Sequence, residues 1–168
     1  MSNERTKGKE LLKNGYALMD ISNRTKEINE RSAAALASQK IRFTVLIKSS
    51  EKKKIFKKLE KVHDKGRVSA IVQSAKLYYA LKDHLDIIPG VYICSDGHNP
   101  SLLKHYLKQF LGGKYSEEKI VILQSLKPLF GKKNIADRAA YYVARENGKP
   151  SLELKEEHFE MLNLIKKK

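Results

Sequence analysis

The pattern of hydrophobic and polar positions is clearest from Pro89 onward, where short apolar runs alternate with stretches of helical spacing. Residues 91–95 and 119–124 predict strands, and residues 100–111 and 134–146 predict amphipathic helices. The run at 119–124 is almost continuously apolar, as in a strand covered on both faces. Strands that alternate with helices form parallel sheets with right-handed crossovers. We therefore predict an α/β fold, a three-layer domain whose mixed, mostly parallel central sheet is flanked by helices.

The middle of the chain adds one strand and two helices to this prediction. Residues 41–47 alternate in polarity and are rich in β-branched types, which predicts a strand. Apolar residues recur at three- and four-residue steps over 50–64 and again over 67–86, which predicts two helices. A strand at 68–72 is the competing interpretation for the start of the second helix. A last helix is predicted at 155–165.

The first 40 residues have a weaker pattern. The Asn-Gly pair at 14–15 indicates a turn and favours a strand over 16–21. Residues 32–39 are rich in alanine and have high helix propensity, which favours a helix. We therefore expect an N-terminal segment over residues 1–40, with a short strand and a helix, followed by the α/β domain over 41–168.

The charge of the chain is strongly one-sided. Its 168 residues include 34 Lys and Arg against 19 Asp and Glu, a formal net charge of +15. Such a field attracts polyanions, of which nucleic acid is the commonest. Lysine enrichment is also a feature of proteins from hot or salty environments, but there glutamate rises with it. The one-sided excess therefore favours nucleic acid, DNA or RNA, as the partner.

Basic and aromatic side chains gather at three places that suit a nucleic acid. Five lysines fall on one helical stripe that can follow phosphates, or else form a solvated face: Lys54, Lys57, Lys58, Lys61 and Lys65. Three more lie before Asp137 and can steer a phosphate backbone: Lys127, Lys132 and Lys133. Tyr78-Tyr79 and Tyr141-Tyr142 can stack on bases, although helical spacing favours one tyrosine of each pair in the core.

Several function classes and compartments are disfavoured by the sequence. The chain has no Gly-x₄-Gly-Lys, Gly-x-Gly-x-x-Gly or Gly-x-Ser-x-Gly motif, which argues against P-loop, Rossmann and serine hydrolase chemistry. Its one cysteine, Cys94, lies in an apolar run and is interpreted as a small buried hydrophobe. With no internal disulfide, no signal-peptide pattern and no long apolar run, we expect a soluble cytoplasmic protein that does not contact membranes.

Two aspartates are the leading candidates for chemistry. Asp96 ends the strand predicted at 91–95, and the carboxyl ends of strands are where open α/β sheets bind ligands. Asp137 lies in the first turn of a later helix and can reach the same edge. Paired carboxylates hold Mg²⁺ or Mn²⁺, and two such ions can drive phosphodiester hydrolysis. The ordinary alternatives are a turn residue for Asp96 and a helix-dipole partner for Asp137. His98 can relay protons or bind metal, although a single turn histidine usually does neither.

Residues 91–146 resemble the second half of ribonuclease-H-like nuclease domains, particularly the uncharacterised DUF3800 group. The resemblance rests on the strand Val-Tyr-Ile-Cys-Ser-Asp that ends at Asp96 and the helix Ile-Ala-Asp-Arg-Ala-Ala that contains Asp137. It implies an acid at the end of the first strand, here Asp20, and another from the first long helix, here Asp83 or Asp86. It also implies three antiparallel opening strands, of which the pattern reveals at most two before Ser50.

The sequence thus predicts a nucleic-acid-processing protein, and the specific hypothesis is a divalent-metal-dependent nuclease that cleaves phosphodiesters. In that hypothesis Asp96, Asp137 and His98 act in catalysis, and Mg²⁺ or Mn²⁺ is bound by four aspartates: Asp20, Asp86, Asp96 and Asp137. The first alternative is a non-catalytic DNA- or RNA-binding protein that uses a lysine-rich helix face. The second is a basic interaction module that meets an acidic protein. The sequence leaves the oligomeric state open.

Overall fold

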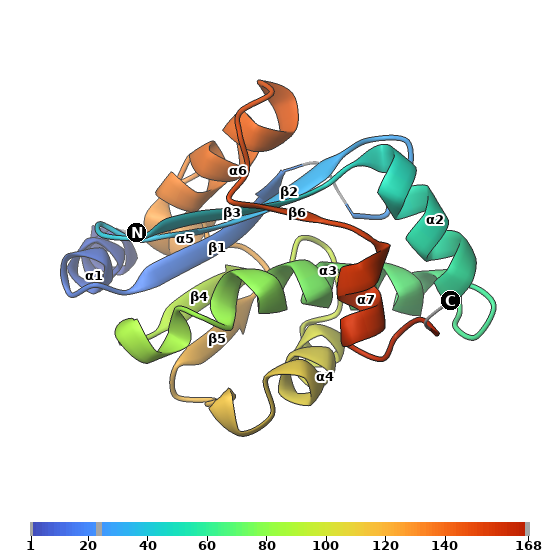
Figure 1. Ribbon diagram of the computed structural model, residues 1–168. Helices are drawn as coiled ribbons and strands as arrows, with labels where there is room; N and C mark the ends of the chain where they lie inside the picture. Colours follow the sequence, from blue (N-terminus) through green and yellow to red (C-terminus); the bar gives the residue numbers. More distant parts are fainter. Residues whose placement is uncertain (1, 23–24, 167–168) are drawn as a thin grey trace.

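The structure, a computed structural model, describes residues 2–22 and 25–166 and is built on one six-stranded mixed sheet (Figure 1). The strand order is β5-β4-β1-β2-β3-β6. The first three strands form an antiparallel meander, β4 runs parallel to β1, β5 to β4, and β6 to β3. The strands are β1 (Ala17–Ser22), β2 (Ser32–Ala37), β3 (Arg42–Ile47), β4 (Val91–Cys94), β5 (Ile120–Leu123) and β6 (Leu152–Leu154).

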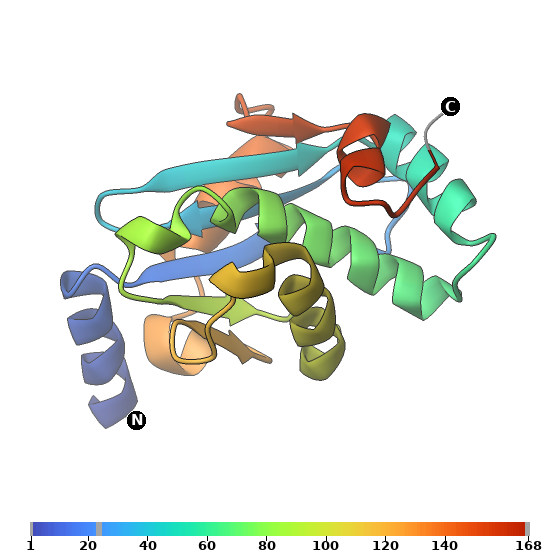
Figure 2. The same ribbon diagram turned by 60° about the horizontal axis from the view of Figure 1, so that its bottom comes forward.

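Helices cover both faces of this sheet, which confirms the predicted three-layer α/β fold. α6 (Ile135–Arg145) crosses β1, β2 and β3 on one face. α3 (Lys65–Leu81) covers β2 and β3 on the other, with α4 (Pro100–Leu111) packed beside it (Figure 2). The other helices are α1 (Ser2–Lys13), α2 (Ser49–Leu59), α5 (Lys127–Phe130) and α7 (Glu156–Met161), with 3-10 turns η1 (Leu85–Ile87) and η2 (Gly112–Lys114). Within the described residues, none of these helices combines the length and apolar character needed to span a bilayer.

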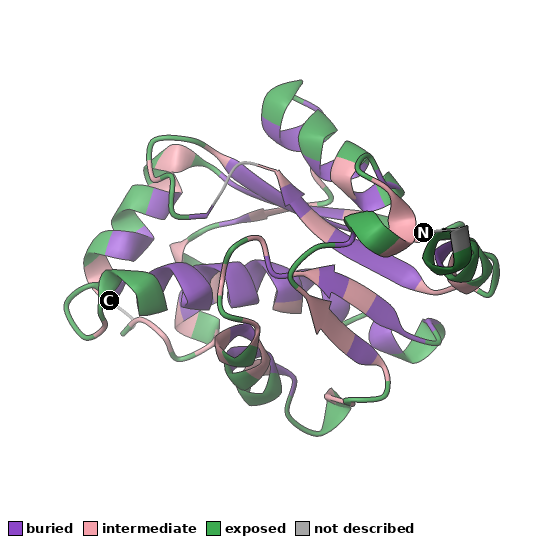
Figure 3. Ribbon diagram, turned by 180° about the vertical axis from the view of Figure 1, so that it is seen from behind, coloured by how far each residue is buried: buried purple, intermediate pink, exposed green. Residues whose placement is uncertain are grey.

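The core lies on both sides of the sheet because successive strand residues point to opposite faces. In β1, Met19 belongs to the main core formed with α3, whereas Leu18 packs with Ala136 of α6. Buried residues accordingly fill most of β1 and β2 and the inner faces of α3 and α6, whereas β5 and β6 are largely of intermediate burial (Figure 3). Asp20 follows Leu18 by two positions and therefore shares the face of β1 that α6 covers. This alternation is what brings a carboxylate of the central strand toward α6.

The helix expected at 32–39 is wrong, because this segment forms β2. All six residues of β2 are buried, with β1 on one side and β3 on the other. Four of them are alanines, whose short side chains let α6 lie close to the strand. Sheet pairing here outweighs the high helix propensity of alanine. The opening therefore has three antiparallel strands rather than two, and the sheet continues across the boundary expected at residue 41.

The two middle helices are also divided differently from the prediction. The helix predicted at 50–64 ends at Leu59, and the next one begins at Lys65 with the Asp64 carboxylate accepting a hydrogen bond from the Arg67 amide. A carboxylate at that position satisfies an amide that the first turn leaves unpaired. The alternative strand at 68–72 is wrong, since this segment lies inside α3. The last helix is shorter than predicted and follows the unpredicted strand β6.

Candidate phosphate-binding cavity and the acidic edge of the sheet

Asp20 of β1 and Asp137 of α6 are both hydrogen-bonded to Asn134, Asp20 through its carboxylate and Asp137 through its backbone amide. Asp137 lies in the first turn of α6, which Asn134 caps by accepting a hydrogen bond from the Asp137 amide at 2.9 Å. The other end of the same amide side chain donates from Nδ2 to Asp20 Oδ2 at 3.0 Å. The second oxygen of Asp20 accepts from the Ile21 amide at 2.9 Å. Asn134 therefore ties the start of α6 to the Asp20 carboxylate.

The two carboxyl groups influence one another electrostatically. Burial raises the pKa of Asp20 above its ordinary value, and the negative charge of Asp137 adds to this, while the bonds from Asn134 and Ile21 oppose it. Burial also raises the pKa of Asp137, with Lys133 and Arg138 opposing the increase. The structure thus joins Asp137 with Asp20, the acid that the resemblance implied for the first strand.

Cys94 ends β4 beside these acids and has the properties of an unreactive thiol. It is half-buried, and burial raises its pKa to about 11, with the charge of Asp20 adding to the increase. Its Sγ donates a weak hydrogen bond to the carbonyl of Gln124 at 3.7 Å. Since the thiolate is the reactive form, Cys94 stays protonated at neutral pH and acts as a packing residue.

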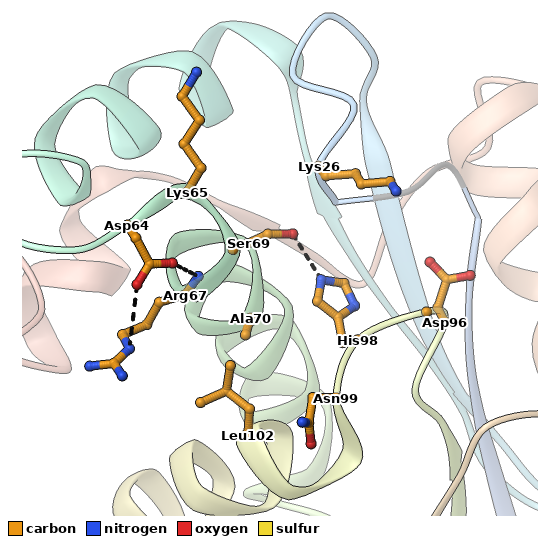
Figure 4. A pocket seen from close by; sticks show the side chains of 12 residues that line it. Lys26, Asp64, Lys65, Arg67, Ser69, Ala70, Asp96, His98, Asn99 and Leu102 are labelled. Carbon is orange, nitrogen blue, oxygen red and sulfur yellow. Dashed lines mark hydrogen bonds and ion pairs between the residues drawn. The ribbon is translucent and has the colours of Figure 1, made fainter.

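Asp96 lies on a tight turn after β4 and faces a different space. Its φ of 47° and the 76° of Gly97 place two successive residues in the left-handed region, which turns the chain toward α4. Asp96 lines a cavity of about 680 Å³ between the first turns of α3 and α4 (Figure 4). Three basic side chains line the same cavity: Lys26, Lys65 and Arg67. Asp64, the cap of α3, also lines it.

His98 fastens this turn to α3. Its Nδ1 lies 3.1 Å from the carbonyl of Ser95, and its Nε2 lies 2.8 Å from the hydroxyl of Ser69. A carbonyl oxygen only accepts, so Nδ1 carries the hydrogen and Nε2 accepts from Ser69. Burial lowers the pKa of His98, and the charges of Lys76 and Lys26 add to this, against the bond to Ser95. The imidazole is therefore neutral at pH 7, with both nitrogens engaged, and it positions the loop.

Lys76 is buried in the middle of α3, whereas Asp83 and Asp86, the acids that the resemblance implied for the long helix, lie beyond its end. Lys76 of α3 donates from Nζ to Thr25 Oγ1 at 2.8 Å and to Ser32 Oγ at 2.5 Å, and Thr25 donates in turn to Gln73 at 2.7 Å. Burial holds the pKa of Lys76 well below its usual range, the charge of Lys52 lowers it further, and Asp96 opposes both. The sequence analysis missed this residue. Its signal is that Lys76 is the one charged residue between positions 68 and 81 of the sequence.

Asp86 does not join the other aspartates. It lies in η1, before the start of β4, whereas Asp96 follows the end of that strand. The two are therefore at opposite edges of the sheet. The side chain of Asp86 is 80% exposed, and its carboxylate lies 3.8 Å from Nζ of Lys114. Asp83 is also exposed and pairs with Lys82 at 3.1 Å.

These donors do not fit the Mg²⁺ or Mn²⁺ centre that the sequence suggested. Among residues 2–22 and 25–166, no three His, Cys, Asp or Glu side chains are grouped so that they can hold a metal ion. Both oxygens of Asp20 already accept from N–H groups, and α3 supplies no carboxylate at all. Asp96 faces the basic cavity. A two-ion centre requires several acidic oxygens at one point. Here the candidate carboxylates lie at separate places on the molecule.

The lysines of the predicted stripe do not share one helix. Lys61 lies after the end of α2, and Lys65 begins α3. Lys54 pairs with Glu51 at 2.9 Å, and Lys58 pairs with Glu156. Lys57 is exposed on α2. The remaining predicted lysines occupy two places: Lys127 begins α5, near α1, and Lys132 and Lys133 are exposed before α6.

The two tyrosine pairs differ from each other. Tyr79 is buried and Tyr78 is partly buried against the core, as predicted for such a pair. Tyr141 and Tyr142 are both exposed, so the expectation that one of them packs in the core is wrong. The buried face of α6 consists of alanines and one valine, which leaves no room there for an aromatic ring.

Comparisons with known proteins add no relative to this picture. No protein-family model matches the chain, and neither a curated protein nor a solved structure matches it significantly. The resemblance to ribonuclease-H-like nucleases therefore rests on the two short motifs that end at Asp96 and contain Asp137.

Proposed function

We propose that the protein binds nucleic acid through its sugar-phosphate backbone and does not cleave it by a two-metal mechanism. The observation that carries this proposal is the basic cavity beside Asp96. Its lining combines Lys26, from the connection after β1, with Lys65 and Arg67 of the first turn of α3, whose charged ends point in different directions (Figure 4). Its volume of about 680 Å³ is in the range of small-ligand pockets and is sufficient for a nucleotide unit.

The electrostatics of the cavity favour an anion. The first turns of α3 and α4 border it, and helix N-termini carry partial positive charge from unpaired amides. Lys26, Lys65 and Arg67 add three positive charges against the two carboxylates of Asp64 and Asp96. Asp64 also caps α3, and its carboxylate lies 4.0 Å from the Arg67 guanidinium, so the charges of these two side chains partly offset each other. A phosphate group therefore meets a net positive surface.

The net charge of +15 extends this attraction beyond the cavity. Backbone phosphates are recognised by such charges without regard to base sequence. The affinity is therefore expected to fall steeply with salt, since each neutralised phosphate releases counterions. This behaviour separates nucleic-acid binding from the alternative of a basic module that binds an acidic protein.

The test is the salt dependence of binding to labelled DNA and RNA oligonucleotides, measured by fluorescence anisotropy. Replacing Lys26, Lys65 and Arg67 together by alanine should weaken binding and reduce the slope of log K against log salt by about 2 to 3. The matched control replaces three exposed lysines of α1 by alanine: Lys7, Lys9 and Lys13. α1 precedes β1 and lies at the opposite edge of the sheet from the cavity (Figure 2).

Two results would overturn the proposal. Absence of binding to any oligonucleotide at low salt would remove the function. Equal losses in the cavity variant and the α1 variant would remove the cavity as the site. The non-catalytic part fails separately if Mn²⁺ supports cleavage that Asp96→Asn and Asp137→Asn abolish.

A further inference from the structure

The outer face of α6 combines two exposed tyrosines with basic side chains. Tyr141 is 50% exposed and Tyr142 is 48% exposed, unusual fractions for aromatic residues on a helix that packs against a sheet. The two rings line a surface hollow of about 590 Å³ together with Lys133 and Arg138. Asp137 and Glu146 also line it. This hollow lies on the opposite side of the sheet from the α3–α4 cavity (Figure 1).

The inner face of α6 explains why both rings point outward. Every buried residue of this helix is small: Ala136, Ala139, Ala140, Val143 and Ala144. Small residues let the helix axis approach β1 and β2 closely, which leaves no space for a tyrosine between them. Consecutive helix positions are about 100° apart, so two adjacent tyrosines can both stand clear of the buried stripe. The tyrosines of α6 therefore lie on its solvent face, and its small residues lie on the buried face.

The ring of Tyr142 is held in place before any ligand arrives. It rests on the backbone of Gly148, where an added Cβ would come within 2.2 Å of the ring. The guanidinium of Arg42 lies 6.0 Å from the centre of the same ring, a cation–π distance. A ring that is already oriented loses little entropy when a flat partner stacks on it. Tyr141 lies beside it on the same face of the helix.

We propose that the α6 face, defined as Tyr141, Tyr142, Lys133, Arg138 and Arg42, is a stacking platform for the bases of single-stranded nucleic acid. The inference rests on the proposed function and specifies which form of nucleic acid is preferred. Exposed rings offer a stacking surface to unpaired bases, whereas the bases of a duplex already stack on one another. Asp137 and Glu146 offset Lys133 and Arg138 in the hollow, so Arg42, beside the ring of Tyr142, supplies the net positive charge for the phosphates that join those bases. This combination of flat rings and positive charge fits a single strand.

The test compares three labelled probes of equal length by anisotropy: a thymidine single strand, a duplex, and a strand of abasic sites that has phosphates but no bases. Tyr141→Ala with Tyr142→Ala should weaken single-strand binding by about tenfold or more, because stacking contributes at this level per base. Binding of the duplex and of the abasic strand should not change. Tyr141→Phe with Tyr142→Phe should retain single-strand binding, since the ring and not the hydroxyl stacks.

The controls distinguish stacking from a general effect. Tyr115→Ala removes a tyrosine that also has a lysine over its ring, Lys108 at 5.4 Å, and should leave all three affinities unchanged. Arg138→Ala should instead weaken all three probes and lower the salt slope by about one. Tyr141→Ala alone keeps the contact of Tyr142 with Gly148 and should still lose several-fold in single-strand affinity.

The failure of this inference differs from the failure of the proposed function. If the protein binds none of the probes, the proposed function and the stacking platform both fail. If it binds all three equally and the tyrosine variants change nothing, the platform is wrong while backbone binding through the α3–α4 cavity stands. Equal losses on the abasic strand would also overturn stacking, because that strand offers no bases.

Discussion

Lys76 of α3 donates a hydrogen bond to the hydroxyl of Thr25 at 2.8 Å in the interior of the protein. The contact links the middle of a helix to the connection between β1 and β2. A buried amine needs such partners, because leaving its N–H groups unpaired would cost free energy. The Thr25 hydroxyl in turn donates a hydrogen bond to the side-chain oxygen of Gln73, one turn earlier in α3. The network thus fixes the middle of α3 against the connection between β1 and β2 and against Ser32, the first residue of β2.

Replacing Lys76 by methionine should change how stability depends on pH. Burial lowers the pKa of Lys76 in the folded protein, whereas the unfolded chain keeps the ordinary value of 10.5. Between these values the unfolded state binds more protons, so the free energy of unfolding rises with pH, by up to about 1.4 kcal/mol per pH unit. Lys76→Met removes this contribution. In urea unfolding, the free energy of unfolding of Lys76→Met minus that of the wild type should therefore be larger at pH 7 than at pH 10.

The exposed Lys57 provides the control for that measurement, since Lys57→Met removes an equal charge from the surface of α2. It should shift stability little and equally at both pH values. A difference between Lys76→Met and the wild type that is the same at pH 7 and pH 10 would show that Lys76 is not a desolvated amine.

Asp20→Asn should be more stable relative to the wild type at neutral pH than at acid pH. Burial and the nearby charge of Asp137 raise the pKa of Asp20, so folding favours its protonated form. The stability that this group supports is lost as pH rises from 3.8 through the folded-state pKa. An asparagine carries no charge, but its single side-chain oxygen can accept from only one of the two N–H groups, of Asn134 and Ile21, that the Asp20 carboxylate accepts. We therefore expect the stability of Asp20→Asn relative to the wild type to be greater at pH 7 than at pH 3.

Thermal unfolding of Asp20→Asn and Asp86→Asn at the two pH values checks this expectation. Asp86 is exposed at the other edge of the sheet, and its substitution should leave the melting temperature nearly unchanged. A difference in melting temperature between Asp20→Asn and the wild type that is the same at pH 7 and pH 3 would contradict a raised pKa of Asp20.

His98→Gln should make the protein less sensitive to acid. The folded protein holds His98 neutral because burial lowers its pKa below 6.5, so folding is opposed once the unfolded chain binds a proton. Stability is therefore lost as pH falls below 6.5. Glutamine is neutral throughout and has both a donor and an acceptor for Ser95 and Ser69. Melting temperatures at pH 7 and pH 5 should fall less in His98→Gln than in the wild type or in the exposed-site control His105→Gln.

Gly8→Ala should detach α1 from α5, although alanine is the better helix former. A Cβ at residue 8 would lie 1.9 Å from the backbone carbonyl oxygen of Leu129, and a backbone atom cannot move aside easily. We expect a loss of about 1–3 kcal/mol, as for other overpacked positions. Gly66→Ala, in the first turn of α3, meets nothing closer than 3.4 Å and should be tolerated. Urea unfolding measures the stability of the two variants. Equal stability of Gly8→Ala and Gly66→Ala would argue against close packing of α1 on α5.

The sequence by itself determined the local elements whose signals are carried by neighbouring residues. The strands β4 and β5 follow from short apolar runs, and α4 and α6 follow from helical spacing behind Asn99 and Asn134, both of which cap their helices as expected. Caps and periodicity act within a few residues, so they can be recognised without knowing what packs against them. The positions of Asp96 and Asp137 after or beside these elements were predictable for the same reason.

Only the tertiary structure decided what lies opposite each element. The alanines of β2 give no local signal for a strand, and their strand conformation comes from pairing with β1 and β3. The burial of Lys76, the meeting of Asp20 with Asp137 and the outward position of both Tyr141 and Tyr142 depend on which helix covers which face. These relationships join residues that are far apart along the chain, and their energies arise from packing and desolvation that no local pattern of residues encodes.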